Sequence, residues 1–90
     1  MSLNYKIEYD KPVHKMLKKL DKHVVSKIID WLNERLDGCQ NPRLWGSPLK
    51  GNLGEFWRYR IGDYRVLCKI EDTKLIVLVV DVGDRKEIYK

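Results

Sequence analysis

The sequence has few of the residues that would mark a secreted, membrane or metal-binding protein. Its two cysteines, Cys39 and Cys68, stand far apart and form no spacing typical of a metal site. The longest apolar run, from Leu75 to Val80, is much shorter than the roughly 20 residues that cross a membrane. No apolar segment near the N-terminus suggests a signal peptide. We therefore expect a reduced, cytoplasmic protein without membrane contact.

The common catalytic motifs are also missing. The six glycines form no phosphate-binding loop of the G-x-x-x-x-G-K type. His14 and His23 have no partners at metal-ligand spacing, and no serine, histidine and aspartate are arranged as a hydrolase triad. We therefore expect neither a cofactor nor a bound metal.

The length and charge fit one small domain with an anionic partner. Ninety residues allow a single hydrophobic core, so we assign residues 1–90 to one domain. The chain carries 18 lysines and arginines against 13 acidic residues, a formal net charge of +5. A positive charge of this size favours polyanions or an acidic protein as partners.

The first half of the chain predicts one strand followed by two helices. Tyr5–Tyr9 alternates apolar and polar residues, which is typical of a half-buried strand. Asp10 and Asp21 are good N-caps for two successive helices, and Gly38 is a natural stop after the second. The apolar residues of the first helix are Val13, Met16, Leu17 and Leu20, and those of the second are Val25, Ile28, Ile29, Leu32 and Leu36. We expect the helices to form an antiparallel hairpin.

The second half predicts a loop and three strands. Residues 39–54 are rich in glycine, proline and asparagine, and tight turns follow at 62–63 and 72–73. The expected fold class is α+β with the order β-α-α-β-β-β, in which the helix hairpin packs on one face of an antiparallel sheet. The third meander strand is apolar on both faces and should be the centre of the sheet. The three meander strands are Glu55–Ile61, Tyr64–Glu71 and Lys74–Val82.

Basic residues alternate with apolar residues in the first two of these strands. Because successive side chains of a strand point to opposite faces, Trp57, Tyr59 and Ile61 should pack under the helices. The open face should then carry four basic residues: Arg58, Arg60, Arg65 and Lys69. Planar guanidinium groups suit phosphate, so the cluster indicates a nucleic-acid backbone as ligand.

The simpler interpretation of any one of these arginines is an ion-paired, solvated side chain. Asp63, Glu71, Asp72 and Asp81 are available for such pairs. The clustering of the basic residues on one predicted face favours an anion site instead. Trp31 and Trp45 are most simply packing residues.

Two segments of the chain resemble the RelE/ParE superfamily of toxins from toxin–antitoxin pairs. The first segment comprises Leu49-Lys50-Gly51, Gly54 and Trp57–Val66. The second is Val82–Tyr89. The resemblance implies a RelE-like fold over the whole chain. It favours the RelE branch, whose members are ribosome-dependent endoribonucleases that cut mRNA in the ribosomal A site. The ParE branch keeps the fold but inhibits DNA gyrase.

The resemblance also implies roles for individual residues. Arg65, Arg85 and Tyr89 match the catalytic positions of the RelE branch, while Arg58, Arg60, Lys50 and Lys69 would bind RNA phosphates. Arg65 and Arg85 should both be solvent-facing, so that truncating either would cost under about 1 kcal/mol of stability. The paired positions 58 and 60 are lysines in the best-known RelE toxins, and arginine hardly deprotonates. Asp84 stands where many relatives have histidine.

This set of residues predicts charge stabilisation rather than activation of water. The expected reaction is a metal-free attack by the RNA's own 2′-OH. Two alternatives stay open: a ParE-like gyrase inhibitor, and a catalytically inactive relative that binds antitoxin or RNA. The expected partners are a cognate antitoxin and mRNA on the ribosome, with the free toxin monomeric and its antitoxin complex oligomeric.

Overall fold

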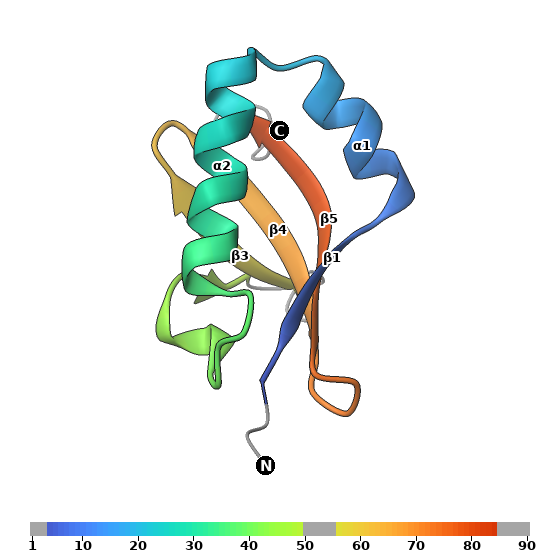
Figure 1. The fold of residues 1–90 in the computed structure, drawn as a ribbon, viewed down its shortest axis with the longest axis vertical. Coiled ribbons are helices and arrows are strands. Elements are labelled where there is room, and N and C mark those ends of the chain that lie inside the picture. Colours follow the sequence, from blue (N-terminus) through green and yellow to red (C-terminus); the bar gives the residue numbers. More distant parts are fainter. Residues whose placement is uncertain (1–3, 50–55, 85–90) are drawn as a thin grey trace.

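The computed structural model describes residues 4–49 and 56–84, which form two α-helices and one five-stranded sheet (Figure 1). The α+β class and the order β-α-α-β-β-β are confirmed, with one short additional strand before the meander. The strands lie in the order β1-β5-β4-β3-β2. In chain order the elements are β1 (Lys6–Tyr9), α1 (Lys11–Lys18), α2 (Lys22–Arg35), the 3-10 turn η1 (Pro42–Leu44), β2 (Ser47–Pro48), β3 (Phe56–Ile61), β4 (Tyr64–Glu71) and β5 (Ile76–Asp84).

Both helices begin where their capping residues predict. The Asp10 carboxylate accepts a hydrogen bond from the Lys11 N–H, and the Asp21 carboxylate accepts one from the His23 N–H. Each bond satisfies a backbone donor that has no partner within the helix. After α2, Gly38 has a positive φ of 82° and donates its N–H to the Tyr5 carbonyl, which turns the chain back along β1.

The predicted meander is present, with one shift at its second turn. Gly62 and Asp63 join β3 to β4, as expected from the sequence. The turn between β4 and β5 extends to Leu75, whose φ is 56°, so β5 begins at Ile76 rather than at Lys74. β5 is an inner strand with apolar residues on both faces, but the middle strand of the five is β4.

The sequence predicted an antiparallel sheet, but the sheet is mixed. β1 pairs with β5 in parallel, from Lys6 opposite Ile76 to Tyr9 opposite Val79. The alternating pattern of β1 contains no information on strand direction, and the long connection through both helices permits a parallel partner. α1 then packs along β5, so that Val13 reaches the core while Met16 lines a groove on the opposite sheet face.

The core lies between α2 and the sheet face that carries the aromatic residues of β3. Ile28 and Leu32 of α2 are almost fully buried, as are Tyr59 and Ile61 of β3. The prediction that Trp57, Tyr59 and Ile61 pack on the helix side of the sheet is therefore confirmed. Burial raises the pKa of the Tyr59 hydroxyl, which donates a 2.7 Å hydrogen bond to the Pro42 carbonyl.

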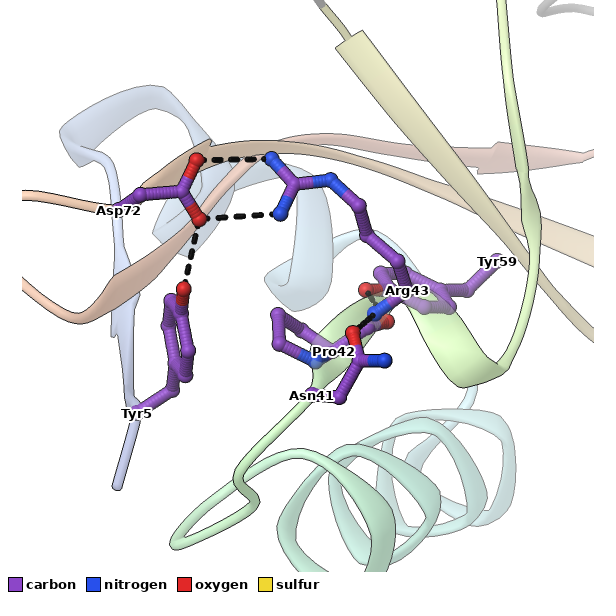
Figure 2. A network of polar contacts seen from close by, with 6 residues as sticks. All are labelled: Tyr5, Asn41, Pro42, Arg43, Tyr59 and Asp72. Carbon is purple, nitrogen blue, oxygen red and sulfur yellow. Dashed lines mark hydrogen bonds and ion pairs between the residues drawn. The ribbon is translucent and has the colours of Figure 1, made fainter. Parts of the chain in front are cut away.

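A polar clamp of Tyr5, Arg43 and Asp72 holds the loop between α2 and β2 against the turn that joins β4 to β5 (Figure 2). Both terminal nitrogens of Arg43 donate to the Asp72 carboxylate at 3.0 Å, and the Tyr5 hydroxyl donates to it at 2.6 Å. The sequence offered Asp72 as a partner for the arginines of the open face. In the structure it pairs with Arg43 of the loop instead. These hydrogen bonds, first that of Arg43 and then that of Tyr5, lower the pKa of the Asp72 carboxyl.

Replacing Asp72 with asparagine should remove a pH-dependent part of the stability. Because the folded pKa lies below the unfolded value of about 3.9, the clamp's contribution is fully present above that value and is lost as pH falls through the folded pKa. Solvent exposure limits the effect to about 1 kcal/mol. Urea unfolding of wild type and Asp72→Asn at pH 7 and at pH 3 measures it, with Glu34→Gln as a control for a surface carboxylate. An equal difference between the two proteins at both pH values would contradict the clamp.

Candidate nucleic-acid interface

The strand register brings the predicted basic residues to one face of the sheet. Arg60 lies opposite Arg65, Arg58 opposite Leu67, and Phe56 opposite Lys69. Directly opposite residues of an antiparallel pair share a face, so Arg58, Arg60, Arg65 and Lys69 all point away from α2. The prediction that these four residues share one face of the sheet is confirmed.

Arg65 is buried, and the prediction that it is solvent-facing is wrong. Only 1% of its surface is exposed, and it is the largest fully buried side chain among the described residues. It lies on the middle strand, between Arg60 of β3 and Gly83 of β5, whereas Arg60 lies near the sheet edge and is exposed. A sequence pattern identifies the face of a strand residue but not how far other parts of the chain cover it.

The open face is divided into a basic part and an apolar part. The apolar part is a groove of about 680 Å³ beside α1. Lys69 lies in this groove and is separated along β4 from Arg65 by Leu67, so it does not join the arginines as predicted. The groove is lined by Asp10, Met16, Phe56, Leu67, Lys69, Leu78, Val80 and Asp81.

The basic part meets the edge of the sheet where β2 ends. Ser47 of β2 lies opposite Arg58, and its hydroxyl accepts a 3.0 Å hydrogen bond from the Arg58 guanidinium. A pocket of about 430 Å³ opens beside this bond. Its lining combines two arginines with two tryptophans: Arg58, Arg60, Trp31 and Trp45, together with Gly46 and Ser47. The sequence placed both tryptophans in the packing only, because nothing in their spacing connects α2 with the loop before β2.

The loop that carries Trp45 and Ser47 is fixed to β3 by its backbone. The Trp57 indole N–H donates a 2.7 Å hydrogen bond to the Trp45 carbonyl. Gly46 lies so close to β3 that a Cβ atom there would stand 2.2 Å from the Arg58 carbonyl oxygen. Its φ of 76° is also one that glycine adopts most easily. Glycine therefore permits the contact that sets Ser47 beside Arg58.

Gly46→Ala should destabilise the protein and disturb the basic pocket. The overlap is with backbone rather than with a flexible side chain, so the loop must move away from β3. We expect a loss of about 1–3 kcal/mol in the free energy of unfolding, measured in urea. Gly38→Ala is the matched control, since its φ is also positive but no atom lies within 4 Å of the added Cβ. Equal losses in the two variants would show that the close approach is unimportant.

Three of the predicted site residues, Lys50, Arg85 and Tyr89, lie outside the residues that the structure describes. Within 4–49 and 56–84, histidine, cysteine and acidic side chains form no group of three or more near enough to share a metal ion. In the same residues, no helix has the length and apolar character needed to span a membrane. Burial raises the pKa of Cys68, and that of Tyr9 to about 12, and both residues lie on the core side of the sheet.

Comparisons of sequence and of structure both relate this chain to toxins of toxin–antitoxin pairs. Residues 7–89 match the model of the family described as the ParE toxin of the type II toxin–antitoxin system parDE. The chain belongs to this toxin family. Toxin RelG of Mycobacterium tuberculosis is 26% identical over 86 residues, which cover 96% of this chain and 97% of RelG.

Solved structures of RelE toxins place this toxin in the wider RelE/ParE superfamily. A mutant of the E. coli toxin RelE in the free state is 26% identical and superimposes with a TM-score of 0.75, covering 96% of this chain and 90% of RelE. The toxin–antitoxin complex RelBE2 of M. tuberculosis matches with a TM-score of 0.78 at 24% identity, covering 91% and 92% of the two chains. The predicted superfamily and the predicted RelE-like fold are thus confirmed.

Proposed function

We propose that this toxin is a ribosome-dependent endoribonuclease that cuts mRNA and so inhibits translation. The observation that carries the proposal is the pairing of Arg60 with Arg65 directly across β3 and β4, with Arg58 on the same face. Like charges directly opposite each other in a sheet are unfavourable. An anion beside the exposed guanidinium of Arg60 would offset this repulsion, and the phosphates of RNA match the planar donors of arginine.

The arginines would divide into two roles. Arg65 is held rigidly by burial, which suits a group that stabilises the charge developing on the reacting phosphorus. With Arg85 it would clamp the scissile phosphate. Arg58 and Arg60 would hold flanking phosphates, together with Lys50 and Lys69, and Tyr89 would stack on a base or assist proton transfer.

The nucleophile in this proposal is the 2′-OH of the RNA itself. The 2′-hydroxyl gives up its proton as its oxygen attacks the adjacent phosphorus. The bond from phosphorus to the 5′-oxygen breaks, and the 5′-oxygen takes up a proton. The products are a 2′,3′-cyclic phosphate and a 5′-hydroxyl end. A site of this composition stabilises charge well but moves protons poorly, which explains a need for the ribosome to orient the substrate.

Induction of the toxin in cells tests the proposal directly. We expect mRNA cleavage to appear within translated regions, mapped by the 5′ ends of the fragments, before any change in DNA integrity. Arrest of growth with intact mRNA and with DNA breaks would instead support inhibition of DNA gyrase. That second candidate is favoured by one observation, the match to the model of ParE toxins.

A cognate antitoxin should bind the apolar groove of the open face. RelBE2 of M. tuberculosis is a toxin–antitoxin complex, and the groove offers apolar residues from α1, β3, β4 and β5 beside the basic part of the face. An acidic segment that folds on binding fits such a surface.

Co-expression with the product of the adjacent gene should yield a complex that survives moderate salt. Leu67→Asp should weaken it strongly, because a charge would replace an apolar side chain of the groove. Lys19→Asp on the exposed end of α1 is the control. Recovery of free toxin only, or no effect of Leu67→Asp, would contradict this binding surface.

A further inference from the structure

The pocket beside the end of β2 has a composition that the proposed phosphate contacts do not require. Arg58 and Arg60 approach it from the basic part of the open face, but the remaining large side chains are the indoles of Trp31 and Trp45. Its volume of about 430 Å³ falls within the range of about 300–1,000 Å³ typical of small-molecule sites. A phosphate alone needs neither an aromatic wall nor this much space.

Both tryptophans are held in place but incompletely covered. Trp31 packs at a tilt against Tyr59, with ring centroids 5.5 Å apart, and the Arg35 guanidinium lies 4.9 Å from the centre of its ring. Trp45 is fixed through its carbonyl, which accepts the hydrogen bond from Trp57. Both indoles remain only half-buried. Both therefore pack against the core and also line the pocket with part of their surface.

The chemistry of this lining matches one nucleotide. Nucleobases stack on aromatic side chains without regard to sequence, and arginine contributes both phosphate contacts and cation–π contacts. No carboxylate among residues 4–49 and 56–84 forms an ion pair with Arg60, whose side chain is exposed at the mouth of the pocket. Arg58 is already oriented by Ser47, which lowers the conformational cost of binding.

We infer that this pocket binds one nucleotide of the RNA substrate, with the base against the indoles and its phosphate on Arg58 and Arg60. The inference rests on the proposed function for the identity of the ligand as RNA. It adds a base-binding site at the edge of the sheet, next to the face on which the phosphates would lie. A base bound in this pocket would fix the direction in which the RNA runs onto the open face of the sheet.

Tryptophan fluorescence of the purified toxin tests the pocket without any cleavage. The probes are adenosine 5′-monophosphate, adenosine and ribose 5-phosphate, with excitation at the red edge of indole absorption to avoid absorption by the base. The monophosphate should quench most tightly. Adenosine should bind more weakly, and ribose 5-phosphate should bind without quenching, as detected by its competition with the monophosphate.

Two matched pairs of variants locate the binding. Trp45→Leu should weaken binding of the monophosphate about ten- to a hundredfold, the loss expected for one base–aromatic contact, while Phe56→Leu on the open face should not. Arg60→Ala should weaken it about tenfold, and Lys27→Ala on α2 should not. Since Arg60 is exposed, its variant tests the site even if Trp45→Leu fails to fold.

A short oligoribonucleotide separates free nucleotide from RNA as the natural ligand. An oligo(A) tetramer should compete with the monophosphate and bind more tightly, because neighbouring phosphates reach the open face. Tighter binding of the monophosphate than of the tetramer would indicate a free-nucleotide site and overturn the assignment to RNA. Absence of quenching by every probe, or equal binding by Trp45→Leu and Phe56→Leu, would overturn the pocket. Neither result bears on whether wild type cuts mRNA, so the inference and the proposed function fail separately.

Discussion

An mRNA with a single 2′-deoxy nucleotide at the cleaved position should remain intact on ribosomes treated with this toxin. The substitution removes the oxygen that attacks phosphorus in the proposed reaction. Arginine side chains hardly deprotonate, so they cannot act as the general base that would activate water in its place. We expect cleavage to fall to background, whereas the unmodified mRNA is cut. A 2′-methoxy substitution at the same position should act in the same way.

Primer extension on ribosome-bound mRNA measures this result, with the Mg²⁺ concentration held constant so that the ribosome stays assembled. A deoxy substitution three nucleotides upstream is the matched control and should leave cleavage unchanged. Full cleavage of the modified mRNA would exclude the 2′-OH mechanism. No cleavage of the unmodified mRNA by folded, antitoxin-free toxin would shift the conclusion to inhibition of DNA gyrase.

Arg65→Ala should lower both the activity and the stability of the toxin. Truncating a side chain that is only 1% exposed leaves a cavity in the sheet, for which we expect a loss of about 2–4 kcal/mol in the free energy of unfolding. This loss exceeds the cost of under about 1 kcal/mol that the sequence predicts for a solvent-facing residue. Removing one group that stabilises the transition state should also slow cleavage about a hundredfold.

Two further variants separate the structural effect from the catalytic one. Arg60→Ala, directly opposite on β3, is exposed and should change stability by less than about 0.5 kcal/mol. Arg65→Lys keeps the positive charge and much of the volume but lacks the planar fork, so it should fold and still cleave poorly. Urea unfolding and mRNA cleavage of the same preparations give both quantities. A well-folded Arg65→Lys with full activity would remove Arg65 from the proposed chemistry.

The sequence by itself determined both helices, the four longer strands and the faces of those strands. Asp10 and Asp21 cap helices through their own backbone neighbours, and alternation fixes which strand residues share a face. These are local effects within a few residues, so the pattern is sufficient to predict them. The placement of Tyr59 in the core and of Arg58 and Arg60 on the opposite face followed in this way.

Only the tertiary structure decided the strand order and which residues of each face are covered. The structure buries Arg65 on the middle strand β4, although its face is the one opposite α2. The parallel pairing of β1 with β5 depends on a contact between residues at the two ends of the chain. The pocket brings Trp31 of α2 beside Trp45 and Arg60. The pairing of β2 with β3 and the absence of a Cβ at Gly46 make this arrangement possible. Such contacts join residues far apart in sequence, and no local spacing encodes them.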